Sequence, residues 1–453
     1  MRIFKRAGKG AAFLGLFVLV NMLMTFLLTP YSSPSTEMWD GYWAQAGNNL
    51  DMIYIGTSQC YESINPQITD KITGLRSYNM GTNAQSLMDT ERALEQAFTD
   101  HEISYVDLVL DYDCLMTGKE RYARPEASFI YAMNRHLPFG RRVRNAVRFV
   151  TDPKYFGQSQ SLNFWFPWLN NRSNMHFEYI LQNAWAKLTG VSPEPDDINN
   201  IRNSSGYKGF HGVINYDTAE PQKKTSWKES KVSGDALAAA DRICQLCREN
   251  GARLTVLVTP VPTSAVLCFE DDYFTRMDYV SGFFEERGAR FFDFNLAKPE
   301  LFSARTDYYK DWIHLNDNGA ESFSRSAALL HCMLYGEDTK EDPEDLFYTP
   351  EEYLASINYV DSVYLKLSSN PGEGIQGTAI AYTGSGVEVE YEIQVRSENS
   401  SKYIIIREYD TEADFHFDPD RPGTWYFKVN ARLTGSGVEF QRCHTASVEY
   451  WLR

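Results

Sequence analysis

The chain has 453 residues, of which 43% are hydrophobic and 23% are charged, a composition that suits two or three globular domains. Its formal net charge of −16 excludes a protein that holds nucleic acid by its phosphates, because so acidic a surface repels them. The seven scattered cysteines do not decide the redox compartment. Cys244 and Cys247 form a CxxC inside a helical pattern without a second ligand pair, so we expect no metal and no cofactor.

The N-terminus predicts a membrane anchor. Four basic residues precede an uncharged run from Ala11 to Leu28, whose main polar interruption is Asn21. A run of this length just spans the hydrocarbon core, and its positive flank predicts a cytoplasmic N-terminus. A cleaved signal peptide is the alternative, but the run is long for one and no A-x-A cleavage pattern follows it. We expect an uncleaved anchor over residues 1–29, a stalk over 30–50, and an extracytoplasmic remainder on a bacterial cell membrane.

A strand and helix alternation begins after the stalk. Asp51 to Ser58 is a short apolar run that ends in Gly-Thr-Ser, which is typical of a buried parallel strand that ends in a functional turn. Further strands are expected at Ser77–Met80 and Val106–Leu110, with a helix between them that Ser86 or Asp89 caps. This order predicts an α/β domain over residues 51–335 with a flavodoxin-like parallel sheet and helices on both faces.

Residues 115–230 interrupt the alternation with many aromatic residues and no strong strand signal. We expect a largely helical and loop insertion that caps the functional edge of the sheet. Its tail, GYKGFHGV at 206–213, places His211 among the residues expected to line the site. The alternation then resumes with helices at 236–250 and 272–287, strands at 253–259 and 289–294, and a last helix at 318–334.

An acidic linker is expected over residues 336–355, and beyond it the sequence changes to short runs in which apolar and polar residues alternate. Residues 356–453 contain seven short alternating strands, which predict a β-sandwich of immunoglobulin or fibronectin-III type. Its aromatic residues are either a glycan-binding platform or core, and the core interpretation, with a spacer or dimerisation role for the domain, is favoured. The residues in question are Tyr391, Tyr403, Tyr409, Trp425 and Tyr426.

Ser58 and His314 are the candidates for chemistry. A serine at the end of a parallel strand lies where such sheets bind ligands, and the following helix N-terminus favours a developing oxyanion. A serine needs a base to take its proton. Asp311-x-x-His314 supplies one, because the spacing lets Asp311 hold one ring nitrogen while the other faces the serine.

These blocks resemble the SGNH/GDSL hydrolase superfamily over residues 50–335: Gly56-Thr57-Ser58, Gly81 after the second strand, and Asp311-x-x-His314 before the last helix. The resemblance implies that Ser58 is the nucleophile, His314 the base and Asp311 its orienting carboxylate. It implies an oxyanion hole formed by the backbone N–H groups of Ser58 and Gly81. Thr57 and Gln59, which flank the serine, are expected to line the site.

The chain departs from the superfamily at its third block. The family usually supplies an Asn from a GxND-like block, whereas this chain has Leu110-Asp-Tyr-Asp113. Asn83 either supplies the missing amide or only caps a helix. The departure fits the branch that resembles the D-alanine transfer protein of teichoic acids and the alginate O-acetylation proteins. That resemblance implies acyl transfer on a cell-surface glycan, in partnership with a multi-spanning membrane O-acyltransferase.

Two functions therefore remain open. The first is an extracytoplasmic serine esterase or O-acyltransferase that acts on a cell-envelope polysaccharide. The second is a non-catalytic scaffold of the same fold that binds envelope polymer or organises a membrane acyltransferase complex. The missing Asn supports the scaffold, and the pairing of a strand-end serine with Asp-x-x-His supports the enzyme.

Overall fold

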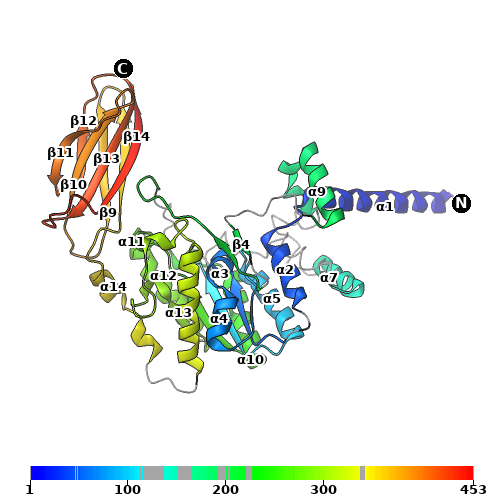
Figure 1. Ribbon diagram of the computed structural model, residues 1–453. Helices are drawn as coiled ribbons and strands as arrows, with labels where there is room; N and C mark the ends of the chain where they lie inside the picture. The colour runs from blue at the N-terminus through cyan, green and yellow to red at the C-terminus, as the bar shows by residue number, and fades with distance from the viewer. Residues whose placement is uncertain are drawn as a thin grey trace. The chain divides into compact units, whose positions relative to one another are not determined.

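The computed structural model describes residues 2–45, 47, 49–111, 115, 137–151, 166–191, 200–202, 205–220, 227–268, 270–336 and 342–451. Within these residues the chain forms two compact units, which are described separately (Figure 1). Unit 1 comprises Met1–Gly209, Glu229–Leu257 and Phe284–Phe291. Unit 2 comprises Phe210–Lys228, Val258–Phe283 and Phe292–Arg453. Much of the insertion expected at 115–230 lies outside the described residues.

A five-stranded parallel sheet in the order β2-β1-β3-β6-β7 forms the predicted α/β region. This order is that of flavodoxin-like doubly wound sheets, so the predicted fold class is confirmed. Such sheets bind ligands beyond the carboxyl ends of the strands, where the strand order reverses between β1 and β3. The strands are β1 Met52–Gly56, β2 Ser77–Asn79, β3 Tyr105–Leu110, β6 Arg253–Val258 and β7 Arg290–Asp293.

Helices with well-formed ends connect these strands. Ser86 caps α5 by accepting the Asp89 N–H at 3.1 Å, which settles the choice between the two predicted caps. The α5 and α10 helices are joined by Arg242, which donates to both carboxylate oxygens of Glu91 at 2.6 and 2.7 Å. The helices are α3 Ser58–Ser63, α4 Pro66–Thr73, α5 Leu87–Asp100, α10 Gly234–Glu249, α11 Thr263–Leu267, α12 Glu270–Glu285 and α13 Asp317–Tyr335.

The expected stalk is a helix that is docked on unit 1. α2, Pro34–Ala44, begins at the Ser33 cap and buries Met38, Trp39 and Tyr42. The Tyr42 ring packs edge-on against Tyr78 of β2 at 5.9 Å. The segment after α1 is therefore part of the folded unit 1.

Three further helices of unit 1 surround or precede this body. α1, Arg2–Leu28, contains an apolar stretch over Gly8–Leu28 that is long enough to cross a membrane. α9, Phe177–Thr189, packs against its end, and α7, Phe139–Thr151, carries several arginines. Short strands β4 Asn200–Arg202 and β5 Lys208–Phe210 pair with each other.

The C-terminal part of unit 2 is a two-sheet β-sandwich. One sheet has the order β11-β10-β13-β14 and the other β12-β9-β8. Side chains from both sheets share one core, which includes Val363, Ile375, Ile393 and Phe427. The strands are β8 Ser362–Asn370, β9 Gly374–Tyr382, β10 Val389–Ser397, β11 Ile404–Asp410, β12 Asp414–Phe417, β13 Gly423–Leu433 and β14 Arg442–Tyr450.

The sandwich aromatics divide between core and surface. Tyr391 and Trp425 are buried in the core, as the favoured interpretation expects. Tyr403, Tyr409 and Tyr426 are only half-buried, and arginine side chains cover their rings. Arg396 lies 3.9 Å from the Tyr426 ring centre and 5.3 Å from that of Tyr403, while Arg432 lies 3.6 Å from that of Tyr409.

The stretch expected to be an acidic linker contains a helix, α14, Pro350–Ser356. A capping box starts it: the Thr349 hydroxyl accepts the Glu352 N–H, and the Glu352 carboxylate accepts the Thr349 N–H. Pro350 occupies the first helical position, where its missing N–H costs nothing. The sequence Thr-Pro-Glu-Glu is the signal for this helix, and its acidic charge had suggested only a solvated connector.

Asp107 generates a test of the core. It lies in β3, is 3% exposed, and burial raises its pKa to about 8, partly offset by a hydrogen bond from Thr255. This folded-state pKa exceeds the unfolded-state pKa, which is about 4. The neutral Asp107 carboxyl therefore contributes its full stabilisation only at pH values below the unfolded-state pKa. We expect the free energy of unfolding to decrease as the pH rises to about 8, by about 1.4 kcal/mol for each pKa unit of the shift.

The Asp107→Asn variant is expected to lack this pH-dependent loss, because its amide does not ionise. The check is urea unfolding of both proteins between pH 4 and pH 8, followed by hydrogen exchange in the β3 peptides. Asp241→Asn, at a surface carboxylate paired with Arg287, serves as the control and should keep the wild-type slope. Equal slopes for Asp107→Asn and wild type would contradict the expectation.

Candidate functional site

Ser58 stands at the junction of β1 and α3. All five residues of β1 are buried, and Thr57 is the N-cap of α3, so Ser58 is the first helical residue. Gly56 is required here, because a Cβ atom at this position would lie 2.2 Å from the Val109 carbonyl oxygen of β3. The helix has only six residues, so its individual N–H groups, rather than a long helix dipole, are available for an oxyanion.

A buried amide, Asn79, clamps this junction to the end of β2. Its side-chain NH2 donates to the carbonyls of Cys60 and Ile64 at 2.9 Å each. Its oxygen accepts the Gly81 N–H at 3.0 Å and the Cys60 thiol at 3.2 Å. Asn79 is completely buried, so these four bonds satisfy a polar group that would otherwise be costly. Sequence reasoning did not select Asn79, although an Asn inside a short apolar strand was a signal.

Gly81 lies against the helix that Ser58 begins. A Cβ atom at Gly81 would come within 2.9 Å of both the Cys60 Cβ and the Tyr61 backbone nitrogen, so only glycine fits. Its N–H already donates to Asn79, and must exchange that partner before it can bind an oxyanion. Asn83 is exposed in a turn between β2 and α5, and Ser86 takes the cap position that Asn83 was considered for.

A cavity of about 110 Å³ opens beside Gly81 within unit 1. Three tyrosine rings, Tyr61, Tyr78 and Tyr207, line it together with residues of α2. Glu37 and Lys208 supply charged groups of opposite sign. The tail of the predicted insertion therefore reaches this cavity, through Gly206, Tyr207 and Lys208.

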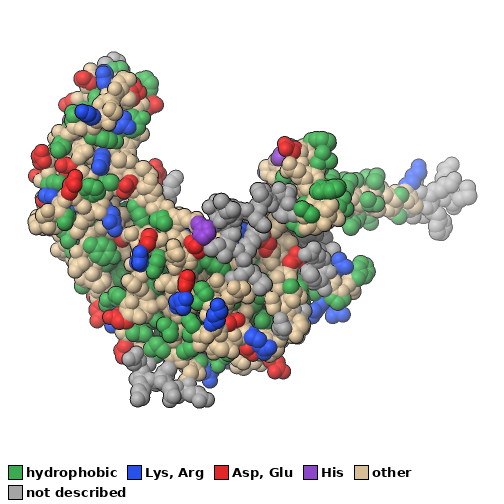
Figure 2. All heavy atoms as spheres, viewed as in Figure 1, with side chains coloured by type: hydrophobic (Ala, Val, Ile, Leu, Met, Phe, Trp, Pro, Cys, Tyr) green, Lys and Arg blue, Asp and Glu red, His purple; other side chains and the backbone are tan. Residues whose placement is uncertain are grey.

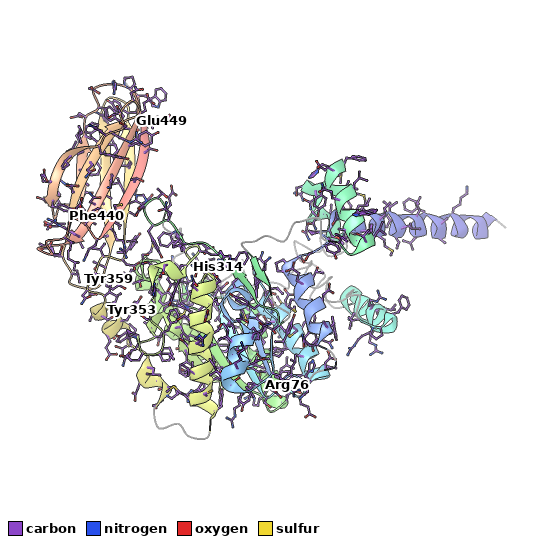
Figure 3. The ribbon with its side chains drawn as sticks, in the orientation of Figure 1. Arg76, His314, Tyr353, Tyr359, Phe440 and Glu449 are labelled. Atoms are coloured by element: carbon purple, nitrogen blue, oxygen red, sulfur yellow. The ribbon has the colours of Figure 1, made fainter. Side chains whose placement is uncertain are left out.

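Asp311 and His314 meet as their spacing predicts. The His314 Nδ1 atom lies 2.9 and 3.0 Å from the two oxygens of Asp311. Oδ1 of Asp311 also accepts the backbone N–H groups of Ile313 and His314 at 2.9 Å. These contacts assign the Nδ1–H tautomer, which leaves Nε2 as the nitrogen turned away from the carboxylate. His314 is labelled in Figure 3.

The electrostatics of the pair favour an ionised carboxylate. Burial alone would raise the pKa of Asp311, but the hydrogen bond and charge of His314, with the Ile313 N–H, outweigh it. The net pKa of Asp311 lies below the ordinary aspartate value. A negative Asp311 stabilises an imidazolium at His314, which a general base requires when it accepts a proton.

The His314 loop is held from both sides in unit 2. Tyr309 and Leu315 pair as an antiparallel bridge across it, and Lys310 donates its backbone N–H to the His314 carbonyl at 3.1 Å. Asn316 is buried: its oxygen caps α13 at Gly319, and its NH2 donates to the Gly212 carbonyl at 2.8 Å. The loop is thus a closed hairpin rather than a mobile connection.

Residues 210–217 form a strap along this hairpin. The Ile214 N–H donates to the Tyr309 carbonyl at 2.9 Å, and the Tyr216 ring packs edge-on against Trp312 at 5.6 Å. His211 Nδ1 lies 2.7 Å from Asp317 Oδ2, in the first turn of α13. His211, expected to line the site, therefore belongs to a second His–Asp pair beside the His314 hairpin.

The remaining candidates flank the serine or end β3. Thr57 and Gln59 are both 5% exposed, so they are part of the packing around Ser58. Asp111 follows β3 and is half-buried, while Tyr112 and Asp113 lie outside the described residues. Ser58 and Gly81 belong to unit 1, and Asp311 and His314 to unit 2, so the pairing of Ser58 with His314 is taken up as a proposal below.

Three buried thiols, those of Cys60, Cys244 and Cys247, are poor nucleophiles. Burial raises the pKa of Cys60 well above its ordinary value, and it raises those of Cys244 and Cys247 to about 11 and about 12. Cys244 and Cys247 are buried free thiols on α10. Among the residues that the structure describes, no cluster of three His, Cys, Asp or Glu side chains is placed to hold a metal ion.

Comparison with known proteins finds solved structures of low similarity. No protein-family profile and no curated protein matches the sequence. The chain is similar to a Streptococcus pneumonia protein described as a platelet activating factor (10% identity, TM-score 0.31, 71% of this chain and 99% of that one). It is also similar to a Desulfitobacterium hafniense protein described as a lipolytic protein of the G-D-S-L family (8% identity, TM-score 0.27, 62% and 99%). Neither likeness transfers an activity.

The Asn79 clamp predicts a local instability on mutation. Asn79→Ala removes all four side-chain bonds and leaves buried carbonyl and N–H groups without partners, so we expect a loss of about 2–4 kcal/mol. Hydrogen exchange of the peptide that spans β1 and α3 measures it. Asn65→Ala, which removes only the exposed cap of α4, should cost about 1 kcal/mol. A loss in Asn79→Ala no larger than in this control would refute the clamp.

Proposed function

We propose that the chain is an extracytoplasmic serine esterase or O-acyltransferase that acts on acyl groups, acetyl or similar, of a cell-envelope polysaccharide. Ser58 is the nucleophile, His314 the base and Asp311 the carboxylate that orients it. The observation that carries the proposal is the Asp311–His314 geometry: a carboxylate on Nδ1, two backbone N–H groups on the same carboxylate, and a closed hairpin around both. A histidine so held has one tautomer and one orientation.

The chemistry proceeds in two steps. The Ser58 oxygen attacks the ester carbonyl while Nε2 of His314 takes its proton, and Asp311 stabilises the imidazolium. The C–O bond to the leaving alcohol breaks, and the imidazolium returns the proton to that alcohol. Water or a sugar hydroxyl then gives its proton to His314 and attacks the acyl-serine. The bond between the acyl carbon and the Ser58 oxygen breaks, and the imidazolium returns the proton to that oxygen. The oxyanion is met by the backbone N–H of Ser58 and, after it leaves Asn79, by that of Gly81, with Asn83 as the side-chain candidate.

The location of the site outside the cytoplasm rests on α1. The apolar Gly8–Leu28 stretch, with its basic flank, is proposed to remain as a single-pass anchor with its N-terminus in the cytoplasm. Retention is supported by contacts with later parts of the chain: Asn183 donates to the Leu27 and Thr29 carbonyls at 2.8 Å. An anchored enzyme acts on polymers at the surface, and a multi-spanning O-acyltransferase is the proposed partner.

The sandwich is proposed to be a fibronectin-III-like spacer. Sheets of four and three strands with the orders β11-β10-β13-β14 and β12-β9-β8 support this assignment. Arginines occupy the ring faces of Tyr403, Tyr409 and Tyr426, which disfavours a role for these rings in stacking on sugars. The Tyr391 and Trp425 rings lie in the core and are not accessible to a glycan.

The second candidate, a non-catalytic scaffold, is favoured by two observations. Asp111 follows β3 where the superfamily carries Asn, and the Gly81 N–H is engaged by Asn79. Both weaken the oxyanion hole, whereas neither touches the nucleophile or the base. The scaffold would keep the fold and the membrane anchor but form no acyl-enzyme.

Labelling with a fluorophosphonate separates the two candidates. We expect the full-length protein in detergent to be labelled, and Ser58→Ala to lose this labelling because the variant lacks the proposed nucleophile. His314→Gln and Asp311→Asn should slow labelling by roughly 10²-fold or more. Unlabelled wild-type protein, or labelling unchanged in Ser58→Ala, would refute Ser58 as the nucleophile and leave the scaffold as the remaining candidate.

Unit 2 supplies matched controls for the histidine. His211 pairs with Asp317 at 2.7 Å and His416 pairs with Asp418 at 2.9 Å, so each resembles the His314 pair in contact chemistry. His416→Gln should label at the wild-type rate, and His211→Gln within about tenfold of it, since neither takes the serine proton. If His211→Gln were labelled as slowly as His314→Gln, the two histidines could not be told apart, and the assignment of His314 as the base would be contradicted.

Hydrolysis and transfer differ only in the acceptor. We expect the acyl-enzyme formed from p-nitrophenyl acetate to be resolved faster as a polyol acceptor is added, if transfer is the physiological reaction. The measurement is the ratio of acetylated acceptor to free acetate at increasing acceptor concentration. A ratio that stays at zero while acetate is released makes the chain an esterase.

A further inference from the structure

Side chains of α9 satisfy the carbonyl groups at the C-terminal end of α1. The last carbonyls of a helix have no partner within the helix, and an unpaired carbonyl in a bilayer costs several kcal/mol. Here the Asn183 side chain donates to the carbonyls of Leu27 and Thr29, and Lys187 donates to those of Phe26 and Thr29. The α9 helix is therefore fixed to α1 at the level where the apolar stretch ends.

A second contact lies deeper along α1. The Trp168 indole N–H donates to the Asn21 side chain at 2.9 Å, and the Phe166 ring packs edge-on against Phe17 at 5.8 Å. Asn21 is the main polar interruption of the apolar stretch, so Trp168 satisfies it. At 1.5 Å per residue, Phe17 lies about 18 Å along the helix from Thr29. The Phe-Pro-Trp-Leu segment at 166–169 thus accompanies α1 well inside the length that would cross a bilayer.

The side of α9 that faces away from α1 is apolar and exposed. Phe177, Leu181, Trp185 and Leu188 follow one another at helical spacing, and each exposes more than half of its surface. Asn183 and Ala186, on the opposite side, are buried. Apolar side chains gather over α1 and α9 in Figure 2. Such a continuous stripe is unusual in contact with water.

α7 also exposes a row of apolar side chains, and it carries positive charge as well. Phe139, Val143 and Val147 are exposed at a spacing of four residues, and Arg141, Arg142 and Arg144 lie on the same helix. An exposed apolar stripe with arginines beside it is typical of helices that lie at a membrane surface. The charge of this helix is opposite in sign to the formal net charge of the whole chain, which is −16. It therefore complements the phosphates of lipid headgroups.

We infer that residues 166–189 form a second membrane element, in which the 166–169 segment enters the bilayer beside α1 and the exposed stripe of α9 lies in the headgroup region. α7 adds a surface contact through its arginines. The inference rests on the proposed anchor, because it needs α1 to span the bilayer. The occupant of the stripe is phospholipid, since the stripe continues directly from the surface of the anchor itself.

Trp185 is a natural reporter for this inference. It is 67% exposed in the middle of the stripe, and Trp451 of the sandwich, at 59%, is a matched control. The full-length protein is reconstituted in phosphatidylcholine and phosphatidylglycerol vesicles whose lipids carry bromine near the headgroup or near the chain end. We expect headgroup-proximal bromine to quench a component of the emission that Trp185→Phe loses and Trp451→Phe keeps. Identical quenching in wild type and Trp185→Phe would overturn the inference.

Two added reporters separate the inference from the anchor. Phe17→Trp is expected to gain a component quenched by the deep bromine, because this position lies near the bilayer centre; without that gain the anchor proposal fails. Phe139→Trp is expected to gain a component quenched near the headgroups, and its absence would remove α7 from the membrane surface. If the Trp185 component disappears as the protein-to-lipid ratio rises and cross-linked dimers accumulate, the stripe binds a second copy and the lipid assignment is overturned.

Discussion

The side chain of Asn79 ties the end of β2 to the helix that carries Ser58. It joins a strand terminus, two carbonyls of α3 and the glycine that follows the strand through four hydrogen bonds from one buried amide. The Ser58 turn also depends on Gly56, which lets β1 approach the Val109 carbonyl of β3. The geometry of the serine is therefore set by neighbours in the sheet and not by α3, which is too short to hold itself.

Local patterns predicted much of this structure. Buried apolar runs located β1 and β3, Ser86 was among the caps proposed for α5, and an i, i+3 spacing placed Asp311 on His314. Each of these depends on residues a few positions apart, where backbone geometry alone decides which groups meet. The alternation of strands and helices then sufficed for the sheet class.

The features that sequence reasoning missed join distant segments. Asn79 contacts residues up to 19 positions away, Asn316 reaches Gly212, and Asn183 reaches Leu27. A local window can mark an asparagine such as Asn79 as unusual inside an apolar strand, but it does not show which distant groups the side chain will bond. The insertion shows the same difficulty. Its place in the chain suggested a cap over the functional edge of the sheet. Of its described residues, those at 166–191 pack along α1 and those at 206–208 line the cavity beside Gly81.

The cap that α9 places on α1 has a consequence for the order of events during synthesis. Lys187 lies 158 residues after Thr29. The carbonyls at the end of α1 therefore have no partner from α9 until those residues have been synthesised. In the interval the segment after Leu28 is uncovered, which is when a signal peptidase would have access to it. Once α9 has folded, the same peptide bonds lie beneath its side chains. If α1 is the proposed anchor, a chain that escapes early processing is then protected from it by the mature fold, and timing as well as sequence would determine whether the protein stays attached.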